Sequence, residues 1–391
     1  MSLPELRTPN RLLLGPGPAN VDPRVLRAMA TPVIGHLDPA FLAVMDDVSQ
    51  FLRQVFRTRN EFTLPLSGTG TAGMEAVMVN LLEPGDEVLV GVAGYFGQRM
   101  AEVARRAGAR VQTVEAEWGT PLDPDRIEAA LRERPARVVA FVHAETSTGV
   151  LQPPGPIVEV AHRHGALAVA DCVTSLGSVP VEVDAWGLDA AYSCSQKGLG
   201  APPGMAPVTF GERALERIRS RKSPVQSFYL DMTQLMAYWG DGARDRAYHH
   251  TAPISMIYAL REALRLVLEE GLEARWERIG RVHRMLVAGL EAMGLRMLVA
   301  PEYRLAPLNT VVVPEGIDAA AVQRRLLDFD IEIASGFGPL KGKIWRVGFM
   351  GVNAEPKNVL SFLAAFETAL REQGLRLEPG AGLAAAAAAA G

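Results

Sequence analysis

Residues 166–171 read Ala-Leu-Ala-Val-Ala-Asp, and residues 193–198 read Ser-Cys-Ser-Gln-Lys-Gly. The first stretch predicts an apolar strand that ends in the carboxylate of Asp171, and the second places Lys197 just after the next strand. Near-continuous apolar strands are typical of a parallel sheet covered on both faces. Ligands of such sheets bind at the carboxyl ends of the strands. We therefore expect Asp171 and Lys197 to emerge on the same edge of one sheet.

The same alternation of strands and helices extends over residues 60–210. Strands are expected at Phe62–Leu66, Glu87–Val92, Arg110–Val114, Val138–His143, Leu167–Asp171, Ala190–Ser195 and Ala206–Phe210. Helices are expected between them at Gly73–Leu82, Gly97–Ala107, Asp123–Arg134 and Pro156–His164. This order predicts an α/β fold with a mostly parallel, seven-stranded sheet covered by helices.

Beyond Pro253 the pattern changes to a long helical run and then to short strands mixed with helices, which indicates a smaller α+β domain. The run is expected over about Ser255 to Gly294, with strands at Asn309–Val313, Ile331–Ala334 and Ile344–Phe349 and helices at Asp318–Phe329 and Pro356–Gly374. The expected organisation is an N-terminal arm (1–15) that reaches a partner or the small domain, a large domain (16–255), a small domain (256–375) and an alanine-rich tail (376–391).

Composition excludes several classes of protein. The chain has 391 residues, 48% of them hydrophobic, and a net charge of −4, so neither disorder nor nucleic-acid binding is expected. Cys172 and Cys194 have no CxxC spacing, and His143, His249 and His250 have no metal-binding spacing, so we expect no disulfide framework and no metal. The first residues do not resemble a signal peptide, and no apolar stretch is long enough to span a bilayer. We expect a cytoplasmic protein that acts on small molecules.

Lysine is rare in this chain. Of 40 Lys and Arg residues only five are lysines, at positions 197, 222, 341, 343 and 357. Arginine stays protonated and cannot form a Schiff base, so a lysine in an apolar, small-residue setting is the candidate nucleophile. Lys197 has that setting, whereas the other four lie in stretches typical of the surface. An ordinary solvent-facing lysine is the alternative interpretation.

Residues 68–73 read Gly-Thr-Gly-Thr-Ala-Gly and match G-x-G-x-x-G between a strand and a helix. A dinucleotide site also needs an acidic residue at the end of the next strand, but residues 93–96 read Ala-Gly-Tyr-Phe. A loop of hydroxyls and free N–H groups at a helix N-terminus suits a single phosphate instead, and a plain tight turn is the alternative.

One ligand explains the loop, the carboxylate and the lysine on a single edge. Pyridoxal 5'-phosphate (PLP) would place its ring nitrogen on Asp171, its aldehyde on Lys197 and its phosphate at Ser67–Thr71. The carboxylate would keep the ring nitrogen protonated, and Lys197 could then move a proton at the substrate. A salt bridge between Asp171 and Lys197 without a ligand is the alternative.

Several motifs together resemble the class V PLP-dependent aminotransferases, most of all their alanine–glyoxylate and serine–glyoxylate branch. They cover roughly residues 10–370 and comprise Gly15-Pro-Gly-Pro18, Ser67-Gly-Thr-Gly-Thr71, Gly97-Gln-Arg99, Glu145-Thr-Ser-Thr-Gly149, Asp171-Cys-Val-Thr-Ser175, Ser195-Gln-Lys197, Ala201-Pro-Pro-Gly204, Tyr248-His-His-Thr251 and Arg346-Val-Gly348. This resemblance implies a fold-type I PLP-dependent transferase that forms a homodimer with its active sites at the subunit interface.

The resemblance also implies a role for individual residues. Lys197 would form the Schiff base, and Asp171 would bind the pyridinium. The remaining cofactor contacts would come from Ser67, Gly68, Thr69, Gly70, Thr71 and Gln196 at the phosphate, Phe96 and Val173 on the two ring faces, Thr146 at the ring hydroxyl, and Tyr248 and Thr251 at the phosphate in the neighbouring subunit. The substrate would be bound by Arg346 at its carboxylate, together with Gly17 and Thr146.

The expected reaction moves an amino group from alanine, or serine, to glyoxylate and gives glycine by a ping-pong cycle through pyridoxamine phosphate. Animal members of the branch carry Trp where this chain has Phe96 and His where it has Thr71, which leaves the amino donor open. No second arginine belongs to a recognisable side-chain pocket, so a small neutral amino acid is favoured over a dicarboxylic one. The alternatives are ureidoglycine–glyoxylate transamination, another small-amine donor, a dinucleotide-dependent oxidoreductase and a non-catalytic cofactor-binding or scaffold protein.

Overall fold

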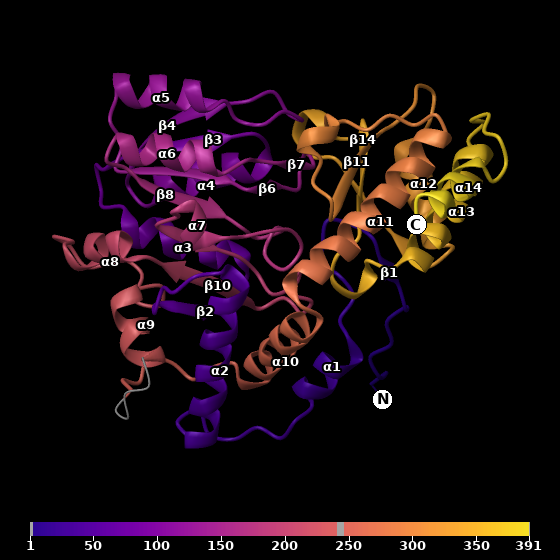
Figure 1. Cartoon of the computed structure of the whole chain (residues 1–391). Coiled ribbons are helices and arrows are strands. Elements are labelled where there is room, and N and C mark those ends of the chain that lie inside the picture. The colour runs from indigo at the N-terminus through magenta and orange to yellow at the C-terminus, as the bar shows by residue number, and fades with distance from the viewer. Residues whose placement is uncertain (1–2, 241–245, 391) are drawn as a thin grey trace.

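The computed structural model describes residues 3–240 and 246–390. Two hydrophobic cores divide the chain, one around a large sheet and one around a small sheet (Figure 1). The first core runs from Val25 to Leu272, and the second joins Leu14 to residues from Ile279 to Ala386. Within these described ranges, no helix is both long and apolar enough to cross a membrane.

The large sheet has the seven strands that the sequence predicts, in the order β2-β10-β9-β8-β5-β3-β4. Only β10 is antiparallel to its neighbours. The bounds are β2 Thr63–Ser67, β3 Glu87–Val92, β4 Arg110–Glu115, β5 Val138–Val142, β8 Leu167–Asp171, β9 Ala190–Tyr192 and β10 Met205–Phe210. All residues of β5 and β8 are buried, as expected for strands covered on both faces.

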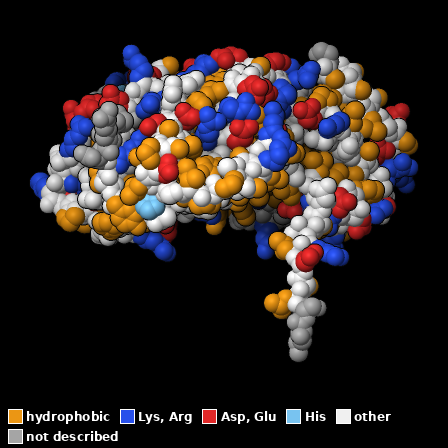
Figure 2. Space-filling model, turned by 90° about the horizontal axis from the view of Figure 1, so that it is seen from below, with side chains coloured by type: hydrophobic (Ala, Val, Ile, Leu, Met, Phe, Trp, Pro, Cys, Tyr) orange, Lys and Arg blue, Asp and Glu red, His pale blue; other side chains and the backbone are white. Residues whose placement is uncertain are grey.

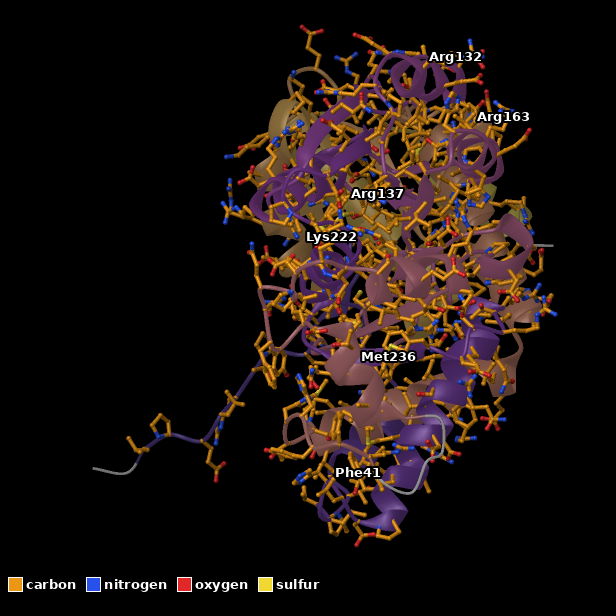
Figure 3. All side chains as sticks on the ribbon, turned by 90° about the vertical axis from the view of Figure 1, so that its left-hand side faces the viewer. Phe41, Arg132, Arg137, Arg163, Lys222 and Met236 are labelled. Atoms are coloured by element: carbon orange, nitrogen blue, oxygen red, sulfur yellow. The ribbon has the colours of Figure 1, made fainter. Side chains whose placement is uncertain are left out.

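Helices cover this sheet. Those that pack directly on its strands include α3 (Gly70–Leu81), α4 (Tyr95–Arg106), α5 (Pro124–Glu133) and α6 (Gly155–Arg163). The other helices of the first core are α1 (Pro23–Met29), α2 (Pro39–Phe56), α7 (Val183–Trp186), α8 (Glu212–Arg219), α9 (Met232–Trp239) and α10 (Ile254–Glu270). A short hairpin, β6 (Ala144–Glu145) with β7 (Val150–Leu151), follows β5. Figure 3 shows how densely the side chains fill the space between these layers.

The expected long helix over residues 255–294 is two helices. Gly271 has a φ of +84°, which favours glycine, and it separates α10 from α11 (Leu272–Ala292). Helix α10 belongs to the first core and most of α11 to the second. We therefore place the boundary between the domains near Gly271, later than the position near 255 that the sequence suggests.

The second core surrounds an antiparallel sheet of three strands, β11 (Leu308–Val312), β14 (Ile344–Gly348) and β13 (Ala334–Ser335), packed against α11, α12 (Ala319–Leu327) and α13 (Pro356–Glu372). Short 3₁₀ turns lie at Pro301–Tyr303, Gly338–Leu340 and Gly351–Asn353. The strand expected at Ile331–Ala334 is divided. Its first part is β12 (Ile331–Glu332), which pairs with β1 (Leu12–Leu13), so the N-terminal arm reaches the small domain.

The alanine-rich tail forms a helix, α14 (Ala381–Ala388), that packs on α11 and α13. The backbones approach closely at Gly289 and Gly382. A Cβ at Gly289 would lie 2.9 Å from the Gly382 carbonyl oxygen, and a Cβ at Gly382 would lie 3.0 Å from that of Gly289. The segment from 381 to 388 is therefore part of the small domain rather than a frayed end.

Candidate active site

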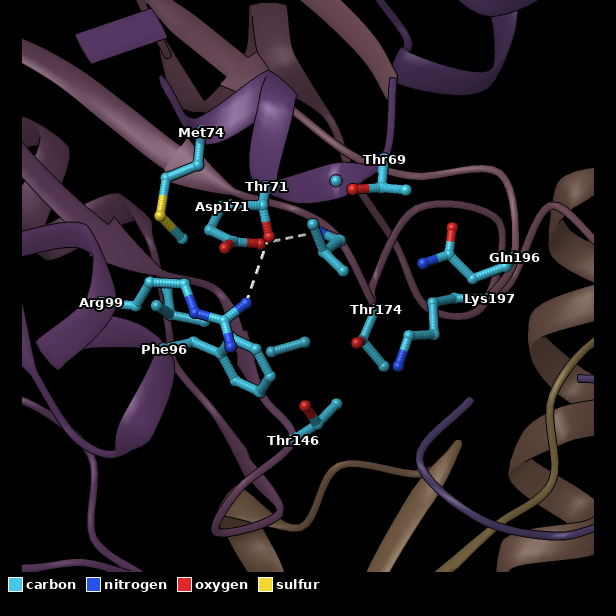
Figure 4. Close-up of a pocket in the computed structure, with 14 residues that line it drawn as sticks. Thr69, Thr71, Met74, Phe96, Arg99, Thr146, Asp171, Thr174, Gln196 and Lys197 are labelled. Carbon is cyan, nitrogen blue, oxygen red and sulfur yellow. Dashed lines mark hydrogen bonds between the residues drawn. The ribbon is translucent and has the colours of Figure 1, made fainter. Parts of the chain in front are cut away.

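A cavity of about 200 Å³ opens at the carboxyl edge of the large sheet (Figure 4). It is lined by Thr69, Gly70, Thr71, Met74, Phe96, Arg99, Val142, Ala144, Thr146, Asp171, Val173, Thr174, Gln196 and Lys197. Nine of the residues named from the sequence are among them: Thr69, Gly70, Thr71, Phe96, Thr146, Asp171, Val173, Gln196 and Lys197. The structure therefore brings the predicted residues together from separate elements.

Asp171 ends β8 at the bottom of the cavity and is 3% exposed. One carboxylate oxygen accepts a hydrogen bond from the Val173 N–H (2.8 Å) and the other from the Tyr192 hydroxyl (2.8 Å). Burial raises the pKa of this carboxyl to about 6, although the charges of Lys197 and Arg99 oppose the increase. Among the described residues no cation lies within 4.0 Å of it. Such a carboxylate is ready to accept a hydrogen bond from a cationic ligand.

Lys197 reaches the cavity from the turn after β9 and is 8% exposed. Its Nζ donates to the carbonyl oxygen of Pro16. Gly17 covers the side chain, because a Cβ at this position would overlap it. Burial lowers the pKa of the ammonium group, and the charge of Arg346 lowers it further. A buried amine with a lowered pKa is a better nucleophile and a better proton acceptor than an exposed lysine.

The N-terminus of α3 forms an anion cradle. Thr69 is the N-cap without a side-chain cap bond, and the described hydrogen bonds include none from the N–H groups of Gly70 and Thr71. Gly70 has no room for a side chain, because a Cβ there would lie 3.1 Å from Cys194 Cβ and 3.2 Å from Val173 Cγ2. Free N–H groups at a helix N-terminus are the donors that a phosphate needs.

The side-chain carbonyl oxygen of Gln196 is buried beside this cradle and has no hydrogen-bond partner among the described residues. A buried polar atom without a partner is costly. The cavity therefore lacks a hydrogen-bonding group that a bound ligand or water would supply.

Phe96 and Arg99 form one wall, at the start of α4. The Arg99 guanidinium carbon lies 5.0 Å from the centre of the Phe96 ring, and its Nη1 donates to the Thr71 hydroxyl (3.2 Å, Figure 4).

Gly94, the N-cap of α4, has no side chain, and Glu145 accepts hydrogen bonds from the N–H groups of Phe96 (3.1 Å) and Gly97 (3.3 Å) instead. Burial raises the pKa of Glu145 to about 7.

Arg346 lies on β14 and is 3% exposed. Its Nε donates to the Ser335 carbonyl (2.7 Å) and its Nη1 to the Thr146 carbonyl (3.3 Å). No carboxylate of the described residues lies within 4.0 Å of this guanidinium, and burial lowers its pKa to about 10. A buried guanidinium with N–H groups to spare is a binding site for a carboxylate.

Six predicted residues are not among those that line the cavity: Gly17 and Arg346, described above, and Ser67, Gly68, Tyr248 and Thr251. The Ser67 hydroxyl is 2.9 Å from Nε2 of His250, and the Gly68 N–H donates to the Gly204 carbonyl (2.9 Å). Tyr248 is 63% exposed, and its hydroxyl lies 3.5 Å from that of Thr251. Neither Tyr248 nor Thr251 lines the cavity of its own chain.

Sequence analysis assigned no role to Arg99, Glu145, Tyr192, Met74 or Thr174, all of which line the cavity or contact residues that do. Arg99 lines the cavity, which was not expected. It donates to the Thr71 hydroxyl beside the N-terminus of α3, whereas Arg346 donates to the carbonyls of Ser335 and Thr146.

The residues present fit PLP. The fit rests on the free donors of α3, the lone carboxylate of Asp171 and the buried amine of Lys197. The fold and this cavity define a PLP-dependent enzyme of fold type I. The chain belongs to the aminotransferase class-V family, whose model matches residues 12–341.

Individual relatives share most of this chain. It is 43% identical to (S)-ureidoglycine–glyoxylate transaminase of Bacillus subtilis, over 98% of this chain and 96% of that one. It is 42% identical to alanine–glyoxylate aminotransferase of Felis catus, over 94% and 89%. The crystal structure of alanine–glyoxylate aminotransferase from Nostoc sp. is 50% identical, covers 95% of this chain and 98% of its own, and superimposes with a TM-score of 0.93.

The family confirms three predictions: the class V resemblance, the aminotransferase activity and PLP as the cofactor. It rejects the dinucleotide-dependent oxidoreductase and the non-catalytic scaffold. The assignment of individual site residues stays a proposal, supported by the geometry above.

Proposed function

We propose that this enzyme transfers an amino group from alanine, or from another small amine donor such as serine, to glyoxylate and releases glycine. The observation that carries the proposal is Arg346, a buried guanidinium without a carboxylate partner among the described residues, whose charge lowers the pKa of the Lys197 amine. One carboxylate clamp suits a small 2-oxo acid. Glyoxylate is also the acceptor in the names of the relatives from Bacillus subtilis, Felis catus and Nostoc sp..

Within the proposed mechanism, the N–H groups at the N-terminus of α3 and the side-chain NH2 of Gln196 would hold the phosphate of PLP, Asp171 would hold its ring nitrogen, and Phe96 and Val173 would lie against the ring. When bound, PLP supplies an aldehyde for covalent attachment of an amine and a ring that takes up the electron pair left at the substrate Cα. Arg346 binds and orients the substrate carboxylate.

Lys197 acts twice in this mechanism. Its Nζ would attach the cofactor, and as a free amine it would remove the proton from the substrate Cα. The pKa lowered by burial keeps a larger fraction of this amine neutral, which proton removal requires. Gly17 and Pro16 limit where Nζ can move, because they lie against the side chain.

Ureidoglycine is the second candidate donor. The relative from Bacillus subtilis that carries this activity in its name matches 98% of this chain, and its crystal structure superimposes with a TM-score of 0.96. Both candidate reactions use glyoxylate as the acceptor, so they differ only in the amino donor.

We also propose that the enzyme is a homodimer in which Tyr248 and Thr251 reach the cofactor phosphate of the neighbouring subunit. The exposure of Tyr248 and Thr251 supports the shared site. Nearby aromatic side chains also support it: the ring centres of Tyr248 and His36 are 5.4 Å apart, and Phe228 is 66% exposed. Figure 2 shows apolar side chains gathered on the lower face beside the projecting N-terminal arm. A cytosolic location is supported by Cys172 and Cys194, which are buried and form no disulfide.

The test is a set of half-reactions. The purified holoenzyme is mixed with alanine, serine or ureidoglycine alone, and the loss of the aldehyde form of the cofactor is followed by absorbance. The aminated enzyme is then mixed with glyoxylate or 2-oxoglutarate. We expect glyoxylate to restore the starting form with the higher efficiency, because Arg99 already donates to Thr71 and the second carboxylate of 2-oxoglutarate would be desolvated without a cation to bind it. An equal or higher efficiency for 2-oxoglutarate would contradict the proposal.

A further inference from the structure

Phe337 stands out among residues outside the cavity lining. It lies in the turn between β13 and β14 in the small domain and is half-buried. The centre of its ring is 4.2 Å from the guanidinium carbon of Arg346 and 4.8 Å from the ring centre of Tyr95 in the large domain. One aromatic side chain therefore contacts both the guanidinium and the helix that carries Phe96.

The turn around Phe337 leaves its backbone little freedom. A Cβ at Gly336 would overlap the carbonyl group of Leu340. Gly338 has a φ of +46°, which favours glycine, and a Cβ there would lie 3.2 Å from the indole of Trp118 in the large domain. The Leu340 N–H donates to the Phe337 carbonyl (2.9 Å). Glycine on both sides thus allows this turn to pack closely against Leu340 and Trp118.

We propose that Phe337 is a positioning residue for substrate binding, which holds the guanidinium plane of Arg346 in the orientation that a substrate carboxylate requires. The inference rests on the proposed role of Arg346. Two carbonyl oxygens, of Ser335 and Thr146, accept hydrogen bonds from Nε and Nη1 of the guanidinium, and the Phe337 ring covers a face. These three contacts, with Ser335, Thr146 and Phe337, then set the direction of the remaining guanidinium N–H groups, in addition to the rotamer preference of the side chain.

The contact is also favourable by itself. A guanidinium over an aromatic face is attracted by the ring quadrupole, most strongly where water is excluded. Arg346 is 3% exposed, so the interaction takes place away from bulk solvent. Because the aromatic face leaves the guanidinium edge free, the ring stabilises the cation without competing for the N–H groups that a carboxylate needs.

Tyr95 connects Phe337 to the segment of the large domain that contains Glu145 and Thr146. Its N–H donates to the Ser147 hydroxyl (2.9 Å), and Ser147 donates to Glu145 (2.6 Å), next to the Thr146 carbonyl that Arg346 binds. Contacts across the two domains therefore connect Arg346 with Phe337, Phe337 with Tyr95, and Tyr95 through Ser147 with the segment 145–147, whose Thr146 carbonyl Arg346 binds. A shift of Phe337 would move the clamp relative to Phe96.

The experiment compares Phe337→Leu, which removes the aromatic face, with Phe337→Tyr, which keeps it. The holoenzyme of each is assayed for kcat and KM with alanine and glyoxylate, and for inhibition by propionate, an unreactive carboxylate. PLP affinity is measured separately by absorbance titration of the apoenzyme. We expect Phe337→Leu to raise both KM values and the propionate inhibition constant about three- to tenfold, with PLP affinity and kcat changed by less than about twofold. Phe337→Tyr should restore all of these constants.

Phe329→Leu is the matched control, because Phe329 stacks on Arg325 at 4.6 Å on the small domain and does not line the cavity. Equal constants for Phe337→Leu and Phe337→Tyr, or an equal effect of Phe329→Leu, would overturn the inference. Phe337→Met replaces the leucine variant if the latter does not fold. Arg346→Ala tests the clamp separately: if it leaves propionate inhibition unchanged, the proposed role of Arg346 fails, whereas a large loss there without one in Phe337→Leu refutes only the role of Phe337.

Discussion

Replacing Asp171 by asparagine should make the apoenzyme more stable and the holoenzyme much less active. Burial raises the pKa of Asp171 from 3.8 to about 6. The folded apoenzyme therefore keeps this proton up to about pH 6, whereas the unfolded chain releases it near pH 4. The stability that protonated Asp171 contributes below pH 4 is therefore lost as the pH rises to 6. The pKa difference of about two units between the folded and unfolded states corresponds to about 3 kcal/mol in the free energy of unfolding.

Asparagine avoids this loss because it does not ionise. Its Oδ1 can still accept from the Val173 N–H, and its amide can donate to the Tyr192 hydroxyl, which then accepts instead of donating. We expect the variant apoenzyme to be about 1–3 kcal/mol more stable than the wild type at pH 8 and nearly equal to it at pH 4. Burial raises the pKa of Glu145 to about 7 in both proteins, and the Asp171 charge raises it further only in the wild type, which adds to the difference in the same direction.

Urea denaturation of both apoenzymes at pH 4, 6 and 8 measures this difference, and a PLP titration with a transamination assay supplies the functional half. The variant should lose at least tenfold in rate, or about 1.4 kcal/mol, because an amide cannot stabilise a protonated ring nitrogen. A stability difference that does not change with pH would show that Asp171 is not a strained buried charge. A loss of rate smaller than tenfold would contradict the proposed role of Asp171 at the ring nitrogen.

The other predictions concern the lysine, the clamp and the assembly. Lys197→Ala should lower transamination by several orders of magnitude, and borohydride reduction followed by mass spectrometry should locate the cofactor on Lys197 rather than on Lys222, which lies at the surface (Figure 3). Arg346→Ala should weaken alanine and glyoxylate together by about 2–5 kcal/mol while cofactor absorbance persists; unchanged binding would refute the clamp. A hybrid of one Lys197→Ala subunit and one Tyr248→Phe, Thr251→Ala subunit should retain near-normal PLP affinity at its only complete lysine site. Affinity there as weak as in the double-variant homodimer would refute shared sites.

Local patterns in the sequence were sufficient for the large domain. Seven short runs of strand-forming residues correspond to the seven strands of the sheet. The carboxyl ends of β2, β8 and β9 bring the phosphate loop, Asp171 and Lys197 to one edge. The predictions that were wrong in detail depend on single backbone conformations. Gly271 divides a run whose hydrophobic pattern is continuous, and residues 331–335 pair with two different sheets.

The residues that sequence analysis missed act through contacts between distant segments, which no local pattern records. Arg99 meets Thr71 from the next helix, and Phe337 meets Arg346 only because a turn of the small domain is folded over β14. One feature of the chain could have indicated Glu145. Gly94 precedes a helix but carries no side chain to cap it, so the N–H groups of Phe96 and Gly97 required an acceptor from elsewhere. Glu145, three residues past the end of β5 on the same sheet edge, was within reach of that helix terminus, and a buried carboxylate there satisfies both donors. An uncapped helix start beside a predicted active site is therefore a reason to search the neighbouring strand ends for an acid.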